Sequence, residues 1–171
     1  MERKILKTAI LILSVILVLL CGATFALMYR QTQALNNQLE AAVVKCAVEE
    51  NFDGEKKTSI AVKNTGNIDA YLRVCLVSYW VDEAGNIISK PSQMPALSKA
   101  DGWVAGTGNT YYYSKPIAPG DSTPNLLAAA LNLENLQVVE VFADAIQSKP
   151  VEAVTGSWGV TIDGDSITAA P

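Results

Sequence analysis

The sequence predicts a mainly β protein: an antiparallel β-sandwich, jelly-roll or immunoglobulin-like, preceded by an N-terminal hydrophobic helix. Three observations lead to this prediction. An unbroken apolar run opens the chain, and two later segments alternate apolar and polar residues with the period of a strand. Roughly eight short strand-like segments recur every 8–12 residues, with turn residues between them. The 171 residues leave room for one domain behind the N-terminal segment.

The N-terminal segment has the layout of a secretory signal peptide. Three basic side chains precede the apolar run, and small residues follow it up to Ala26. This order predicts cleavage by a signal peptidase between Ala26 and Leu27. The alternative is an uncleaved membrane anchor, because 21 uncharged residues, Thr8–Met28, would span about 31 Å as a helix. In both cases the rest of the chain is exported, to the extracellular space or the cell surface.

The composition limits the functions that the exported part can have. Histidine is absent from the chain, which removes the commonest general base and the commonest zinc ligand. Without the four charged residues among the first seven, 10 basic and 16 acidic side chains remain, a net charge of about −6. Such a surface repels nucleic-acid phosphates. We therefore expect no enzyme, no cofactor or metal, no nucleic-acid partner, and membrane contact only through the N-terminal segment.

Three regions follow from these patterns: residues 1–26 as signal or anchor, a polar segment over 27–40 that resembles a tether, and a β-sandwich domain over 41–171. The first strand is expected within 41–50. Residues 58–63 alternate and precede a turn at 64–67, where Gly66 is expected to need a positive φ.

The clearest strand is Ala70–Val81. Leu72, Val74 and Leu76 fall on one face, which we expect to be buried, and Tyr71 and Arg73 fall on the other. Residues 136–147 alternate in the same way.

The other segments are shorter. A turn at 82–86 leads into a strand at 87–89, and 90–97 is a loop. A hairpin joins 103–104 to 111–113, and residues 116–123 turn. Residues 125–133 suit a strand or a short helix, 151–158 a helical turn, and 160–168 a hairpin around Asp163 and Gly164.

Four blocks of the chain, taken together, are similar to one known family. They are Gly22–Ala26, residues 36–43, Val62–Asn67 with Ala70–Val74, and residues 113–123 with Ala145–Gln147. On these blocks the chain resembles the TasA/camelysin group of exported proteins with a SipW-type signal peptide, although Leu39 replaces that family's usual Phe. The resemblance implies a jelly-roll-like sandwich. It also implies, for some members, polymerisation into biofilm matrix fibres by donation of an N-terminal strand to the next subunit.

The leading expectation is therefore an exported structural or interaction protein of the extracellular matrix or cell envelope, fibre-forming or fibre-associated. Its partners would be copies of itself or another matrix protein. The alternative is a monomeric surface module that binds a glycan or host ligand on exposed aromatic residues. The candidates for that platform are Trp80, Trp103 and Tyr111–Tyr113. The metalloprotease activity described for camelysin is not expected here, since the chain has no His-Glu-x-x-His motif.

Cys46 and Cys75 fall in different predicted strands of an exported domain, which permits a disulfide. Alternation puts Cys75 on the Arg73 face and Cys46 among buried valines, so bonded and free thiols both stay open. Arg73 either binds an anion or pairs with a carboxylate or an aromatic ring across the sheet. Three aspartates beside glycine-containing turns lack the spacing of a calcium loop: Asp82, Asp101 and Asp121.

Overall fold

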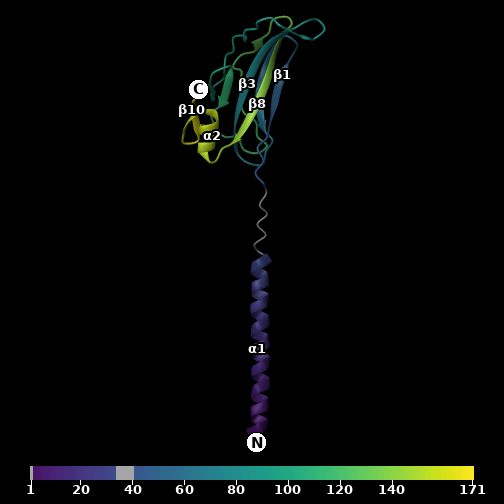
Figure 1. The fold of residues 1–171 in the computed structure, drawn as a ribbon, viewed down its shortest axis with the longest axis vertical. Coiled ribbons are helices and arrows are strands. Elements are labelled where there is room, and N and C mark those ends of the chain that lie inside the picture. The colour runs from purple at the N-terminus through teal and green to yellow at the C-terminus, as the bar shows by residue number, and fades with distance from the viewer. Residues whose placement is uncertain (1, 34–40) are drawn as a thin grey trace. The chain divides into compact units, whose positions relative to one another are not determined.

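The fold is given by a computed structural model that describes residues 2–33 and 41–171 (Figure 1). The chain divides into two units, Met1–Ala41 and Ala42–Pro171. The first unit holds one helix, α1 (Glu2–Gln33). The second holds helix α2 (Val151–Trp158) and all the described strands.

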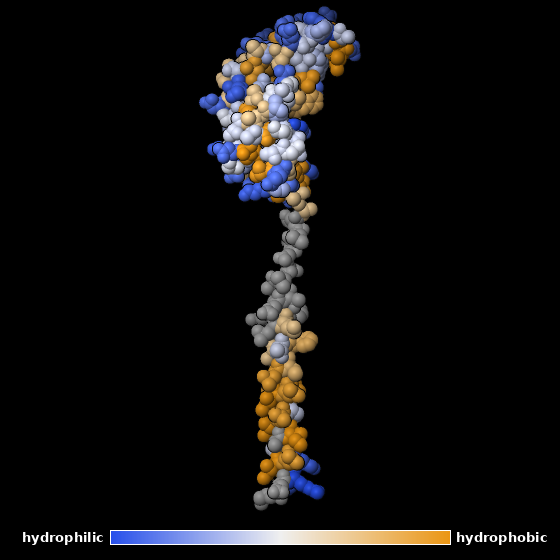
Figure 2. All heavy atoms as spheres, turned by 60° about the vertical axis from the view of Figure 1, so that its left-hand side comes forward, coloured by the Kyte–Doolittle hydropathy of each residue, from blue (hydrophilic) through white to orange (hydrophobic). Residues whose placement is uncertain are grey.

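Helix α1 is apolar over most of its length, with basic side chains at its N-terminal end (Figure 2). Its stretch Arg3–Ala26 has 24 residues and a mean hydropathy of 2.8, long and apolar enough to cross a membrane, a test that a signal sequence passes as well. The helix continues to Gln33, where the sequence predicted a tether from Leu27 onward. Residues 27–33 contain neither Gly nor Pro, so nothing in them stops the helix. The remainder of the predicted tether, 34–40, lies outside the described residues.

The second unit is built from ten described strands, all paired antiparallel. They are β1 (Cys46–Phe52), β2 (Lys56–Asn64), β3 (Ala70–Val81), β4 (Ile87–Ile88), β5 (Trp103–Ala105), β6 (Thr110–Tyr113), β7 (Leu131–Asn132), β8 (Gln137–Gln147), β9 (Thr161–Asp163) and β10 (Ser166–Ala169).

The strands form two main sheets and one small hairpin. One sheet has the order β1-β2-β7. In the other, β3 is central: β8 pairs along one edge, β6 and β4 pair along the other, and β5 lies beyond β6. Strands β9 and β10 form the hairpin. The prediction of a mainly β, antiparallel fold behind an apolar N-terminal helix is confirmed.

Most predicted elements lie where the sequence placed them. The strand Ala70–Val81, the helix at 151–158 and the hairpin at 160–168 are confirmed. The first strand begins at Cys46, later than expected. Residues 125–133 form neither a full strand nor a helix: Leu131–Asn132 pair with β2, and Leu127 forms an isolated bridge to Lys99.

The first apolar core draws on both main sheets. Leu72, Val74 and Leu76 of β3 are at most 1% exposed, which confirms their predicted face. Ile60 and Val62 of β2 belong to the same buried cluster.

A second core lies on the opposite face of β3. Tyr71 packs there with Tyr112, Val154, Trp158 and Ile167, so α2 and the β9–β10 hairpin cover this part of the sheet (Figure 1). The Tyr71 hydroxyl donates a hydrogen bond to the Asp165 carbonyl at 2.9 Å. Both cores consist of residues after 42, so the 42–171 unit has its own hydrophobic cores, as an independently folding domain does.

Candidate functional site

The turn after β2 holds the start of β1 in place. The Asn64 side chain is fully buried, donates to the carbonyls of Ile68 and Ile117 at 2.8 Å, and accepts from the Gly66 N–H at 2.9 Å. Gly66 does not adopt the positive φ predicted from the sequence. The glycine is required because a Cβ there would lie 2.2 Å from the Val43 carbonyl oxygen. The predicted turn is confirmed, but the predicted reason for the glycine, a positive φ, is wrong.

Among residues 2–33 and 41–171, strand β1 has no partner along one edge. Its partner there is β2, and beyond the strand the Thr65 N–H donates to the Lys45 carbonyl while the Asn67 N–H donates to the Val43 carbonyl. In an antiparallel ladder, the backbone N–H and C=O groups of successive residues point alternately toward the partner strand and away from it. The backbone groups of Ala47 and Glu49 therefore point toward β2, and those of Val48 and its even-numbered neighbours point away from the sheet.

Strand β8 also has an edge that no other described strand pairs with. It pairs with β3, and the flanking hydrogen bonds from Ser148 N–H to the Asp69 carbonyl and from Val81 N–H to the Leu136 carbonyl set the register. By the same alternation, the even-numbered residues of β8 bond to β3. The N–H and C=O groups of Val139, Val141 and Ala143 point toward the open edge.

The two open edges border one groove. β1 and β8 approach each other without pairing, and a hollow of about 500 Å³ lies along them. Unpaired strand edges are templates for an added strand. The groove is lined by Val48, Glu50 and Phe52 of β1, by Gln137–Val141 of β8, and by Lys57, Tyr79 and Leu133.

A buried cation lies in the wall of this groove. Lys57 is 5% exposed, and its Nζ is 2.7 Å from Glu50 Oε2 and 5.3 Å from the centre of the Phe52 ring. The carboxylate and the ring face both compensate for the desolvation of the ammonium. The charge of the buried Lys57 is thus offset by Glu50, while Glu140 adds a second carboxylate to the lining.

Gln137 closes the β8 end of the groove with a polar cluster. Its Nε2 lies 3.0 Å from Ser78 Oγ and 2.9 Å from the Gln93 carbonyl, and its Oε1 accepts the Glu134 N–H. The Ser78 and Ser92 hydroxyls are 2.7 Å apart. These bonds hold the loop at 90–97 against the strand ends.

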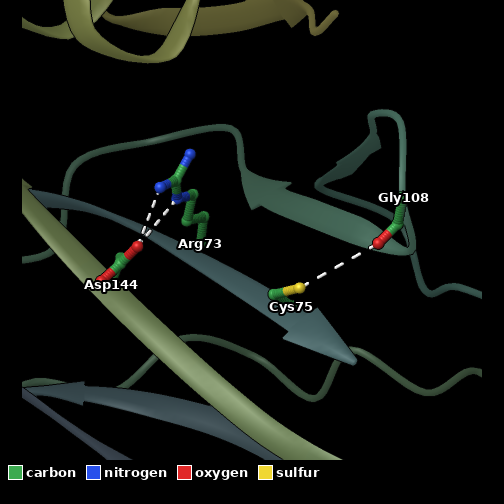
Figure 3. A network of polar contacts seen from close by, with 4 residues as sticks. All are labelled: Arg73, Cys75, Gly108 and Asp144. Carbon is green, nitrogen blue, oxygen red and sulfur yellow. Dashed lines mark hydrogen bonds and ion pairs between the residues drawn. The ribbon is translucent and has the colours of Figure 1, made fainter. Parts of the chain in front are cut away.

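Arg73 is engaged by its own chain. Its guanidinium lies 2.8 Å from Asp144 Oδ2 (Figure 3). It also lies over the Trp158 ring, 4.9 Å from the ring centre. Burial lowers the pKa of Arg73, but the hydrogen bonds to Asp144 and Tyr112 and their negative charges together outweigh burial, so the pKa is raised. Of the two predicted uses of Arg73, the structure has the carboxylate and aromatic pairing.

The two cysteines carry free thiols in the structure. Cys46 packs against the first core, and burial raises the pKa of its thiol, with a smaller effect of the Asp144 charge. Cys75 lies on the Arg73 side of β3, with its sulfur 4.0 Å from the Gly108 carbonyl (Figure 3).

The aromatic residues predicted as a glycan platform pack into the protein. Trp103 is 2% exposed and stacks edge-on to Tyr113 at 5.4 Å. Tyr112 is buried in the second core, and Trp80 is 8% exposed beneath Lys90, whose Nζ is 3.5 Å from the ring centre. They do not form one exposed surface.

The remaining sequence-predicted positions are not among the residues that line the groove. Ala26 and Leu27, the predicted cleavage pair, lie within α1. Asp82 accepts hydrogen bonds from its own turn, including the Asn86 side chain at 3.0 Å. Within residues 2–33 and 41–171, no three acidic or cysteine side chains gather as a metal site would require.

Sequence reasoning missed the groove itself. Alternation over 136–147 identified β8 as a strand, but which strands lie at sheet edges depends on pairing between distant segments. No known protein family, curated protein or solved structure matches the chain. The function must therefore follow from the chain's own geometry.

Proposed function

We propose that this chain is an exported, non-enzymatic structural protein of the extracellular matrix or cell surface, whose subunits associate by adding a strand to the groove between β1 and β8. The observation that supports this is the pair of open antiparallel edges bordering one hollow. An edge with free N–H and C=O groups gains main-chain hydrogen bonds when a strand is added. In this proposal the two main sheets form a jelly-roll-like sandwich around the first core.

The segment after the cleavage site is the proposed donor. Residues 27–33 are helical as the continuation of a long apolar helix. Cleavage after Ala26 would leave a short polar stretch, and isolated helices below about 12–15 residues are marginal in water. The freed segment 27–39 can then become extended, and its 13 residues would reach about 43 Å.

The length of the donor suits the acceptor. β8 offers an edge of 11 residues, about 36 Å long as a strand. In an extended donor, Leu35 and Leu39 would share a face with Leu27 and Tyr29, because side chains alternate along a strand. That face would point into the hollow. Because donor and acceptor differ, the contact is head-to-tail and generates an open-ended polymer.

The first experiment asks whether the segment is exported and processed. Mass spectrometry of the secreted protein should find a mature N-terminus at Leu27. Recovery of only the intact Met1 form, from membranes, would show instead that α1 is retained as an anchor and that the segment is not released.

The second experiment asks whether the segment is the donor and the groove the acceptor. The 27–171 form should give filaments by electron microscopy and fast-sedimenting species, and the 40–171 form should stay monomeric. Val141→Pro removes an N–H that faces the open edge, a position where strands tolerate proline, and should block filaments. Val141→Thr keeps the N–H and should preserve them. Equal behaviour of the two lengths would eliminate the donor, and filaments of Val141→Pro would eliminate the groove.

A further inference from the structure

Within the part of the chain that the structure describes, the outer face of the β3 sheet is covered over only half its length. Near the start of β3, α2 and the β9–β10 hairpin bury Tyr71 and Tyr112 against Trp158. Farther along, from Cys75 to Val81, no element of this second core is present. Residues that lie directly opposite each other on paired strands share a face of the sheet. The strand register therefore identifies the side chains on the uncovered half, which we call the bare half.

The bare half is apolar. Cys75 lies opposite Phe142, Val77 opposite Glu140, and Val81 between Ile87 and Leu136. The exposed fractions are 50% for Phe142, 42% for Val77, 71% for Ile87 and 40% for Leu136. A contiguous apolar area of this kind on an exported protein is typical of an interaction surface. We call these residues, with Glu140, the open face.

The only charged side chain at these register positions is acidic. Glu140 is exposed opposite Val77, and the turn beyond β3 adds Asp82 and Glu83. The nearest basic group on the face, Arg73, is already paired with Asp144. Like charges that face each other across an interface are unfavourable. A second copy docked face to face would bury two Glu140 carboxylates in one interface with no basic side chain at these register positions to pair with them, and an anionic bilayer would be repelled too.

The covered half shows what kind of element fits this sheet. There, α2 lies on the strands through Val154 and Trp158, one helical turn apart, both at most 8% exposed. We infer that the open face binds an amphipathic helix of another protein, with an apolar stripe flanked by lysine or arginine that meets Glu140. This surface shares Glu140 with the lining of the β1–β8 groove, but its apolar residues Val77 and Phe142 lie outside that lining, and the inference goes beyond the proposed assembly.

The experiment uses the 42–171 unit, which contains both cores and lacks the proposed donor, so polymerisation cannot interfere. The probes are two amphipathic leucine peptides of roughly 15 residues, long enough to be helical, one with lysine and one with glutamate as the polar residue. Amide chemical shifts of the isotope-labelled unit report the site, and the concentration dependence reports affinity.

We expect the lysine peptide to shift the amides of Val77 and Phe142, which lie outside the groove lining, and to bind at least about tenfold more tightly than the glutamate peptide, as complementary charge requires. Phe142→Ser should weaken it by about tenfold, since large aromatic anchors dominate such contacts. Phe52→Ser, which alters an equally exposed ring in the groove, is the matched control and should leave binding unchanged. Glu140→Lys should reverse the preference between peptides.

The inference is overturned by equal binding of both peptides, by shifts confined to the groove, by no binding at millimolar concentration, or by a dimer that Phe142→Ser abolishes.

Discussion

Replacing Gly66 by alanine tests the account of how the chain enters the first strand. The new Cβ would lie 2.2 Å from the Val43 carbonyl oxygen, 3.1 Å from the Lys45 nitrogen and 3.2 Å from Asn64 Oδ1. Two of these neighbours are backbone atoms, so the 43–45 segment must move away from the turn. Since φ of Gly66 is not positive, the conflict is one of space and not of backbone conformation.

The magnitude follows from the hydrogen bonds that hold this segment. Val43 N–H donates to Asn67 Oδ1 at 2.7 Å, Asn67 N–H to the Val43 carbonyl at 3.0 Å, and Thr65 N–H to the Lys45 carbonyl at 2.9 Å. Each is worth about 1 kcal/mol net, so Gly66→Ala should lower the free energy of unfolding by about 2–4 kcal/mol.

The assay is urea unfolding of the 42–171 unit followed by circular dichroism. Gly156→Ala is the matched control, because a Cβ there meets nothing within 4 Å and the residue lies inside α2. Alanine should stabilise that helix by up to about 1 kcal/mol. If Gly66→Ala costs less than about 0.5 kcal/mol, or if both substitutions cost the same, the steric explanation of Gly66 is wrong.

Three further predictions concern the core, the buried cation and the turn after β3. Leu76→Ala should cost about 2–5 kcal/mol in the same denaturation assay, because this 1% exposed side chain leaves a cavity; a cost below about 0.5 kcal/mol would refute the assigned face. Lys57→Met should be close to neutral, whereas Glu50→Ala should destabilise by about 1–3 kcal/mol by leaving a desolvated ammonium unpaired; the reverse order would contradict the account of the pair. The Asn86 side chain and backbone N–H groups hold the pKa of Asp82 below its usual range, so its stabilising effect should be present above pH about 3.9 and be lost as the pH falls through the lower folded-state value. Carbon-13 NMR titration of the Asp82 carboxyl checks this, and a midpoint at or above about 3.9 would disprove it.

The sequence by itself determined the local elements. Alternation placed the strand Ala70–Val81 and assigned Leu72, Val74 and Leu76 to its buried face. Turn residues located the hairpins, and the apolar run identified the N-terminal helix. These features depend on neighbours within a few residues, because strand and helix periods are local properties of the backbone.

Only the tertiary structure decided which faces and edges are covered. Tyr71 and Val77 fall on the same face of β3 by alternation. Tyr71 is nevertheless 1% exposed, because α2 and the β9–β10 hairpin cover it, whereas Val77 is 42% exposed. The space beside Gly66 is filled by the Val43 carbonyl, and Val43 lies just before β1 in the chain. The groove exists because β1 and β8, some ninety positions apart in the chain, are both left unpaired on adjoining edges. Coverage and pairing of this kind are set by contacts between distant segments, and a periodicity that repeats every two residues holds no information about them.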